Sequence, residues 1–295
     1  MNIGQGGTAL DPTAPLTPSG NLRRRKLVSR LAEWGATAAA ILAVGVLGIV
    51  VFTVVSRGAS AIDFDFIVKG YPDGVGPMLV GTAVLVAVAT LIALPVGVLI
   101  ALFLTEYADS RSSAVIRLTL DLMNGLPSVI VGVFVFGLLV YGHTQSGIAG
   151  GFALSIVMLP LIARSTQEVL RLVPQTQRDG AAALGATKAR IVLGIVIPSA
   201  LGGILTGTVL AIARAIGETA PLLFTTSIFV NSVSTDPSHA MPNMPVQIFI
   251  WSESPNPEDH ARAWATALIL LLFVLVTSLL ARAGLARWRK KMGQV

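Results

Sequence analysis

Long apolar runs without a charged side chain dominate the chain. They cover residues 34–56, 74–105, 122–163, 191–213 and 263–281. An ionised group at the centre of a bilayer costs about 2.5–3.5 kcal/mol even on a lenient scale, so such runs predict membrane-spanning helices. About 20 residues cross a bilayer; the run 122–163 is twice that long with a polar stretch inside it, so it predicts two helices. The pattern predicts an all-α polytopic membrane protein with six transmembrane helices.

Composition supports a membrane protein over a soluble enzyme. Of the 295 residues, 54% are hydrophobic and 12% are charged, whereas a soluble domain carries about 25% charged residues. The absence of cysteine excludes disulfides, thiolate nucleophiles and sulfur-ligated metals. The histidines, His143, His239 and His260, fall on expected outer loops without the spacing of metal ligands. We therefore expect neither a metal site nor a cofactor.

The basic residues indicate how the helices are oriented. Most of the 21 lysines and arginines lie in the N-terminal segment, in loop 106–121, in loop 164–190 and in the C-terminal tail. In a six-helix arrangement these segments share one side of the membrane. Because loops rich in lysine and arginine stay in the cytoplasm, both termini are predicted to be cytoplasmic, with the protein in the cell membrane. The net charge of +6 then reflects orientation, and we expect no nucleic-acid partner.

Two connecting segments are unusual. The cytoplasmic loop 164–190 has an Ala-rich helical composition interrupted by Pro174 and Gly185, which predicts short helices with sharp turns and Gly185 as a helix stop. An ordinary amphipathic surface loop is the alternative. The outer segment 219–262 begins with a charge-free stretch, residues 219–235, which we expect to be partly embedded or to lie on the surface rather than to form a seventh span.

A charged pair follows the fourth apolar run. Arg214 and Glu218 are four residues apart, so on a helix they share a face. The same face continues through Ala211, Gly207 and Gly203, with the Gly-x-x-x-Gly spacing that lets helices approach closely. Ionisable residues at membrane depth are candidates for a functional site. A structural ion pair, or charges that snorkel to the outer boundary, is the alternative.

The cytoplasmic loop resembles a motif of the permease subunits of binding-protein-dependent ABC importers. That motif is Glu-Ala-Ala, three residues, Gly, nine residues, Ile, one residue and Leu-Pro. The residues in the same register here are Asp179, Gly180, Ala181, Gly185, Ile195, Ile197 and Pro198. Aspartate stands for the glutamate and glycine for the first alanine, while the spacing is kept throughout.

Two further segments narrow the resemblance. Residues 214–223, Arg-Ala-Ile-Gly-Glu-Thr-Ala-Pro-Leu-Leu, are similar to a segment of phosphate-importer permeases of the PstA type, and residues 126–132 are similar to their third-helix segment. The resemblance extends from about Gly76 to Ala281. It implies the type I ABC importer permease fold and a non-catalytic subunit that moves inorganic phosphate inward by alternating access. The chain has no Gly-x-x-x-x-Gly-Lys-Ser/Thr loop, so ATP hydrolysis is expected of a partner.

The resemblance also implies roles for individual residues. Arg214 would bind the oxyanion, and Glu218 would hold Arg214 in the empty pathway and accept a hydrogen bond from protonated phosphate. Ser128 and Thr219 would supply hydroxyl contacts, whereas Asp121 and Asn124 are expected to serve in helix packing or capping. The residues implied to form the loop that couples to the ATPase are Asp179, Gly180, Ala181, Gly185, Ile195 and Pro198.

The resemblance implies a domain organisation and a set of partners. The expected regions are a flexible basic cytoplasmic segment 1–33, a first transmembrane helix and outer loop 34–73, the importer transmembrane domain 74–285 with coupling loop 164–190, and a basic cytoplasmic tail 286–295. The expected partners are a paralogous phosphate permease subunit that completes the pathway, two copies of a cytoplasmic ABC ATPase, an extracytoplasmic phosphate-binding protein and membrane lipid.

Other functions are weighed against this one. A permease for another oxyanion, molybdate or sulfate, is disfavoured by the segment that begins at Arg214. An integral membrane enzyme would need paired catalytic groups at membrane depth, and apart from Asp121 near the cytoplasmic boundary the expected spans contain no acid–base set. An inert scaffold would leave both the loop motif and the charged pair unexplained.

Overall fold

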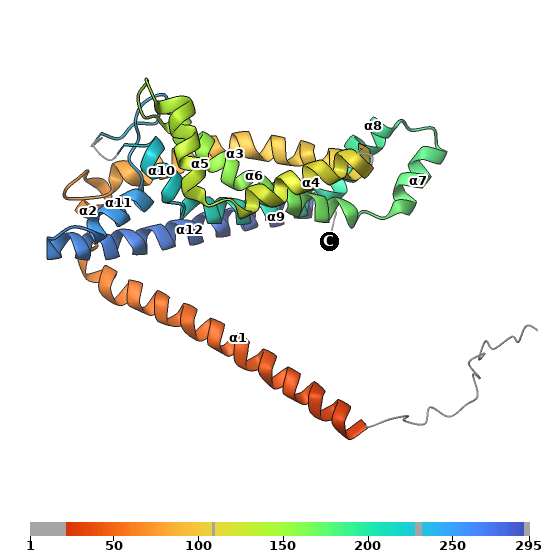
Figure 1. Cartoon of the computed structure of the whole chain (residues 1–295), viewed down its shortest axis with the longest axis horizontal. Coiled ribbons are helices and arrows are strands. Elements are labelled where there is room, and N and C mark those ends of the chain that lie inside the picture. The colour runs from red at the N-terminus through yellow and green to blue at the C-terminus, as the bar shows by residue number, and fades with distance from the viewer. Residues whose placement is uncertain (1–21, 108–109, 228–231, 292–295) are drawn as a thin grey trace, which may run out of the picture. The chain divides into compact units, whose positions relative to one another are not determined.

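The computed structural model describes residues 22–107, 110–227 and 232–291 and contains helices but no strand in these ranges (Figure 1). It divides into two compact units, residues 1–53 and 54–295, which are described separately. The helical elements, in chain order, are α1 (Leu22–Gly58), η1 (Ala59–Ala61), α2 (Phe64–Val68), α3 (Gly76–Leu102), η2 (Phe103–Tyr107), α4 (Ser110–Gly125), α5 (Ser128–Val135), η3 (Phe136–Val140), α6 (Gly147–Arg171), α7 (Gln175–Ala183), α8 (Lys188–Ile191), η4 (Val192–Val196), α9 (Ile197–Ile216), α10 (Ala220–Thr225), α11 (Met244–Ser252) and α12 (Pro257–Lys291).

Five helices of the described chain are long and apolar enough to cross a membrane, and a bent pair brings the number to six. Four of the five coincide with the expected single spans, and the fifth, α6, is the second half of the run 122–163. The all-α polytopic architecture predicted from the apolar runs is therefore confirmed.

The first unit consists of α1 as far as residue 53. Helix α1 begins at Leu22, so residues 22–33 are helical where we expected a flexible segment. Leucine and arginine are good helix formers, and the apolar span that follows extends the helix backward through them. The expected C-terminal tail is also helical in part, because residues 286–291 continue α12. Residues 1–21 and 292–295 lie outside the described residues.

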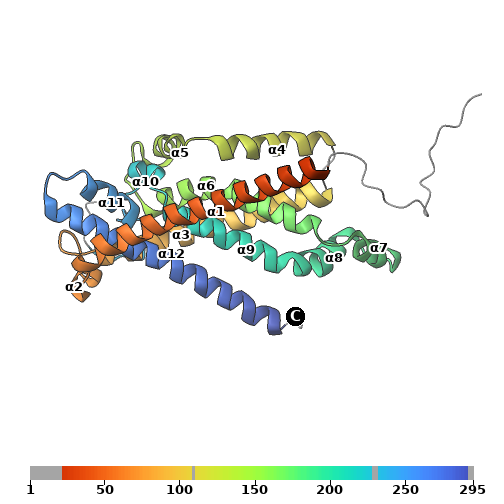
Figure 2. The same ribbon diagram turned by 90° about the horizontal axis from the view of Figure 1, so that it is seen from below.

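In the second unit, α3, α6 and α9 pack side by side and form the centre (Figures 1 and 2). Small residues bring them together. A Cβ on Gly207 would lie 2.3 Å from the hydroxyl of Ser165 on α6, and one on Gly203 would lie 2.4 Å from Val169. The face of Ala211, predicted as a helix interface, is therefore packed against α6, as the Gly-x-x-x-Gly spacing indicates.

The third span is not the single straight helix that the apolar run suggests. Helix α4 ends at Gly125, α5 begins at Ser128, and the two halves meet at an angle of 99°. Pro127 lies at the break, with φ −57° and ψ 129°. Proline has no backbone N–H, and it disfavours the helical conformation for the residue before it, here Leu126. The break has a consequence for the site, since it places Ser128, the first residue of α5, at a cavity.

The loop after α6 forms two short helices, α7 and α8, as predicted. In both views they lie at one end of the second unit, and α2 and α11 lie at the opposite end (Figures 1 and 2). Helix α8 continues through the π-helical turn η4 into α9, giving one apolar span, Lys188–Ile216. Pro198 lies in the first turn of α9, where its missing N–H is tolerated.

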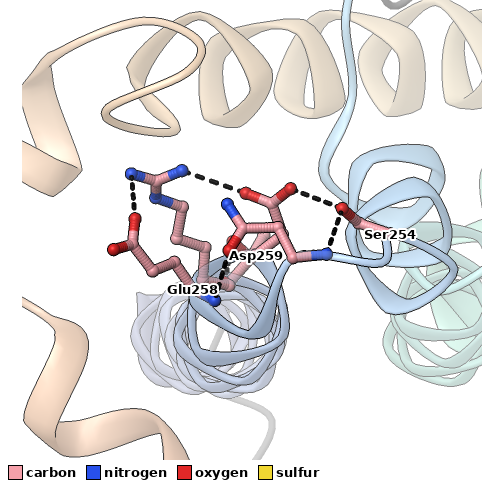
Figure 3. A network of polar contacts seen from close by, with 6 residues as sticks. Ser254, Glu258 and Asp259 are labelled. Atoms are coloured by element: carbon pink, nitrogen blue, oxygen red, sulfur yellow. Dashed lines mark hydrogen bonds and ion pairs between the residues drawn. The ribbon is translucent and has the colours of Figure 1, made fainter.

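The described residues of segment 219–262 form no seventh span. Residues 220–225 make the short helix α10, which packs against α5 and α6 and is too short to cross a bilayer. Beyond α11, a polar network fixes the start of α12 (Figure 3). The hydroxyl of Ser254 donates to Asp259 at 2.6 Å, Asp259 accepts from Arg262 at 3.0 Å, and Asn256 accepts from the backbone N–H of Glu258 at 3.1 Å. Asn256 thus caps α12, and Glu258 and Asp259 lie in its first turn, where the helix dipole favours negative charge.

Candidate functional site

Arg214, Glu218 and Ser128 line one small cavity in the second unit. Its volume is about 80 Å³. The cavity lies where the break between α4 and α5 meets α6 and the C-terminal end of α9, so four elements form its wall. The lining residues are Met123, Asn124, Leu126, Ser128, Val131, Ile156, Val157, Arg214 and Glu218.

Arg214 and Glu218 form a loose ion pair beside this cavity. Helix α9 ends at Ile216, and the N–H of Glu218 bonds to the carbonyl of Ala215 at 3.1 Å, which turns the chain just past the helix end. The Nε of Arg214 lies 3.6 Å from Oε1 of Glu218, too far for a strong hydrogen bond. The Glu218 side chain is 17% exposed, whereas that of Arg214 is 59% exposed. The guanidinium therefore keeps donors free for another acceptor.

The broken span adds a second source of positive potential. Ser128 is the first residue of α5, and it lines the cavity. The first N–H groups of a helix have no partner within the helix, and the helix dipole is positive at this end. Half-helices that begin at membrane depth direct this end at anionic groups in other transporters. A guanidinium and a helix N-terminus at one cavity suit a small anion.

The structure separates the other candidates. Thr219 lies at the start of α10, where its carbonyl accepts from the backbone of Leu222, and it is not among the cavity residues. Asn124, which we expected in packing or capping, lines the cavity and adds an amide to it. Asp121 has the packing role, since it forms an ion pair with Arg164 between α4 and α6. The proximity of Asn124 to Pro127 was the one signal in the sequence for its position.

The motif residues of loop 164–190 lie on and around an exposed helix. Helix α7 has no buried residue, and Leu184 at its end is 90% exposed. Asp179 accepts a hydrogen bond from Gln175 at 2.9 Å and is otherwise open to solvent. Ile195 and Pro198 lie half-buried in η4 and α9, which follow the loop. Helix α7 is therefore not part of the core, and an exposed apolar side chain at its end is typical of an interaction site.

Gly185 ends α7 as predicted. Its φ is +78°, and its N–H bonds to the carbonyl of Ala182 at 2.9 Å. The N–H of Ala186 bonds to the carbonyl of Ala181 at 3.1 Å. This pair of bonds is the Schellman arrangement, in which a residue with positive φ satisfies the last carbonyls of a helix. Gly180 has no such conformation, so its φ does not require glycine.

A family model matches residues 93–290 of this chain, and it describes the inner membrane component of binding-protein-dependent transport systems. The chain belongs to this family. The match covers α6, α7 and α9, and with them the cavity and the exposed helix.

Relatives within the family share most of the chain. The phosphate transport system permease protein PstA of Pasteurella multocida (strain Pm70) is 36% identical over 240 residues, which cover 79% of this chain and 85% of the relative. PstA 1 of Mycobacterium tuberculosis (strain H37Rv) is 39% identical over 217 residues, which cover 72% of this chain and 69% of the relative.

Solved structures establish the fold of this family member. A chain of a bacterial ABC transporter involved in alginate import has a TM-score of 0.65 at 14% identity, covering 90% of this chain and 99% of that chain. A chain of the MetNI methionine ABC transporter in an inward-facing conformation has a TM-score of 0.58 at 18% identity, covering 72% and 94%. The fold is that of type I ABC importer permeases, as the loop motif implied.

Proposed function

We propose that this chain is the permease subunit of an ATP-driven importer of inorganic phosphate and forms half of the translocation pathway. The observation that carries the proposal is the cavity of Arg214, Glu218 and Ser128 at the break of the third span. The PstA relatives, at 36–39% identity, support phosphate as the cargo. The chain itself has no ATP-binding loop, so the energy comes from a partner.

The size and charge of the cavity support a small oxyanion. At about 80 Å³ it is far below the roughly 300–1,000 Å³ of pockets for drug-sized ligands. The guanidinium of Arg214 offers planar, permanently charged donors, and Ser128 adds a hydroxyl and the N-terminus of α5. These features suit phosphate better than a sugar or an amino acid.

Glu218 supplies the preference among oxyanions. A carboxylate beside the site repels a fully ionised anion, but it accepts a hydrogen bond from the proton that phosphate keeps near neutral pH, which sulfate lacks. The alternative cargo, sulfate or molybdate, would gain nothing from Glu218. Replacing Glu218 with glutamine should therefore reduce phosphate uptake relative to sulfate uptake, and unchanged uptake and preference would contradict this role.

The remaining expectations concern partners and orientation. Both termini and α7 face the cytoplasm, since the segments richest in lysine and arginine lie on that side. Helix α7, with Asp179 and Gly180 on its exposed surface and Gly185 at its end, docks on one of two ABC ATPase subunits. A paralogous permease completes the pathway, a binding protein delivers phosphate from outside, and lipid surrounds the spans. Closure of the ATPases rocks the permeases between inward- and outward-open states.

Phosphate uptake tests the proposal. Cells whose only copy of this subunit carries Arg214→Gln are compared with wild type and with Arg282→Gln, an exposed arginine of α12. We expect uptake to fall about tenfold or more for Arg214→Gln, since a hydrogen bond to a charged group contributes about 1.5–3 kcal/mol. Assembly and ATP hydrolysis of the purified complex should be retained. Unchanged phosphate uptake in this variant would overturn the proposal, and selective loss of sulfate or molybdate uptake would favour the alternative cargo.

A second variant tests the docking helix. Gly185→Arg places a side chain on a residue with positive φ at the end of α7, so it should uncouple ATP hydrolysis from uptake while leaving the cavity intact. Normal coupling in this variant would contradict the assignment of α7.

A further inference from the structure

A buried ion pair attaches the exposed helix α7 to the rest of the protein. Nη2 of Arg178 lies 3.0 Å from Oε1 of Glu106, and the two side chains are 13% and 9% exposed. Arg178 also donates to the carbonyl oxygens of Leu170 at 2.9 Å and Val173 at 2.5 Å. None of the roles described above uses this pair, although charged residues with so little exposure are rare unless they are paired.

The pair joins three elements that are separate in the sequence. Glu106 belongs to η2, the turn that continues α3, while Leu170 lies in the last turn of α6 and Arg178 lies in α7. The carbonyl of Leu170 also accepts from the backbone N–H of Val173 at 3.4 Å, so the guanidinium adds a second, charged donor at the end of α6. Helix α7 has no buried residue and packs on the core through the partly buried Ala181, so the ion pair is a second, polar point of attachment. The rigid, planar fork of arginine fixes direction as well as distance.

Helix α6 connects this anchor to the anion cavity. It is continuous from Gly147 to Arg171, and Ile156 and Val157 on it line the cavity of Arg214. At 1.5 Å per residue, the carbonyl of Leu170 lies about 20 Å along the helix from Val157. Helix α3 packs closely along the same helix. A displacement of the anchor therefore moves one wall of the cavity.

We propose that Glu106 and Arg178 are positioning residues that clamp α7 to α3 and α6, so that a displacement of α7 by the ATPase reaches the cavity wall. The inference rests on the proposed function, since it assumes that an ATPase moves α7. Without the clamp, α7 pivots on the linker 172–174, and its movement is lost before it reaches α6.

The assembled complex with its partner permease, ATPase and binding protein tests the clamp. Glu106→Gln and Arg178→Gln are compared with Arg171→Gln, a matched change of an exposed arginine. Arg171, Glu106 and Arg178 all line one cavity of about 630 Å³ beside α7. We expect basal ATP hydrolysis to change by no more than about twofold, because this chain has no ATP-binding loop and hydrolysis takes place on the partner ATPase. Stimulation by the phosphate-loaded binding protein should fall about fivefold or more, the scale of a coupling between two sites. The double variant should be no worse than Arg178→Gln alone, because replacing Arg178 already removes the contact with Glu106 along with those to Leu170 and Val173.

A covalent bridge separates positioning from charge. The chain has no cysteine, so Glu106→Cys with Arg178→Cys can be joined by a short bifunctional thiol reagent in the intact complex. If the pair acts by position, the bridge restores stimulation, whereas a monofunctional reagent of similar size does not. Full stimulation in both glutamine variants, or no recovery in the bridged complex, would overturn the clamp.

Hydrogen exchange distinguishes failure of the clamp from failure of the proposed function. If phosphate-loaded binding protein does not stimulate the wild-type complex, the proposed cargo is wrong, but exchange of the α7 amides still reports on the clamp. We expect faster exchange in Glu106→Gln and Arg178→Gln, an intermediate rate in Arg178→Lys and no change in Arg171→Gln. Equal α7 exchange in all of these complexes would overturn the clamp regardless of cargo.

Discussion

Two glycines of the docking helix should respond in opposite ways to the same substitution. A Cβ added at Gly180 or at Gly185 meets no atom within 4 Å, so neither change creates a clash. The two positions differ in backbone conformation, since Gly185 has φ +78° and Gly180 does not adopt positive φ. Replacing each by alanine therefore isolates the contribution of the helix stop.

The magnitudes follow from this difference. Left-handed backbone costs an alanine about 1–2 kcal/mol, and the reduced freedom of the unfolded segment returns about 0.4–1 kcal/mol. Gly185→Ala should thus destabilise the formed α7 by about 1 kcal/mol. Gly180→Ala should stabilise it by about 0.5–1 kcal/mol, because glycine is a poor residue inside a helix. At 25 °C, 1 kcal/mol changes an equilibrium constant by about fivefold.

Amide hydrogen exchange across α7 in the assembled complex measures both effects. We expect exchange to be about fivefold faster in Gly185→Ala and about two- to fivefold slower in Gly180→Ala, since local opening governs the rate. Phosphate uptake should fall in the first variant and remain at least at the wild-type level in the second. Equal effects of the two substitutions, or faster exchange in Gly180→Ala, would show that φ at Gly185 does not control the helix end.

Three further predictions concern the rest of the molecule. Gly207→Ala should destabilise the α6–α9 contact by about 1–3 kcal/mol, because the added Cβ would lie 2.7 Å from the Cβ of Ser165. Gly194→Ala is the control, since its added Cβ meets no atom within 4 Å. Unfolding in detergent should show a loss of stability in the first variant and not in the second. Asn256→Ala should lower the free energy of unfolding by about 1 kcal/mol through loss of the cap on α12, whereas Asn256→Asp should keep the cap. The same unfolding assay measures both variants, and equal losses of stability would refute the cap. The backbone N–H of Ser238 holds the pKa of Asp236 below its ordinary value of 3.8. The lowered pKa stabilises the turn at pH values above the unfolded pKa, and this stabilisation is lost as pH falls through the folded pKa. The midpoint of the Asp236 carboxyl titration followed by NMR should therefore lie below 3.8, and a midpoint at or above 3.8 would contradict the hydrogen bond.

The features predicted from the sequence are those set by local rules. The apolar runs determine the spans because a charge at membrane depth is costly. Gly185 ends α7 because an Ala-rich segment followed by glycine favours the Schellman turn. The stripe of Gly203, Gly207 and Ala211 predicts close packing through its spacing alone.

The features that were missed depend on tertiary contacts. Glu106 and Arg178 are 72 positions apart; Glu106 directly follows the apolar run 74–105 and Arg178 lies within loop 164–190, so nothing local pairs them. Pro127 is visible in the sequence, but the packing of α10 against α5 is a contact between distant residues. The position of Asn124 at the cavity follows from that bend. A single sequence does not show which distant residues are in contact. Pro127 could therefore indicate a break in the third span, but not that the break would place Asn124 at the cavity.

The exposure of Arg214 supports the proposal that a second permease completes the pathway. Its side chain is 59% exposed, whereas that of Glu218 beside it is 17% exposed. A guanidinium at membrane depth is costly against lipid and inexpensive against water or a complementary surface. An exposed guanidinium would be costly if this face of the chain met lipid. It is expected if a second permease covers the face and encloses the proposed pathway. If this reasoning holds, Arg214 should become protected from solvent-borne arginine reagents when the partner permease is bound, and it should react freely in the isolated chain.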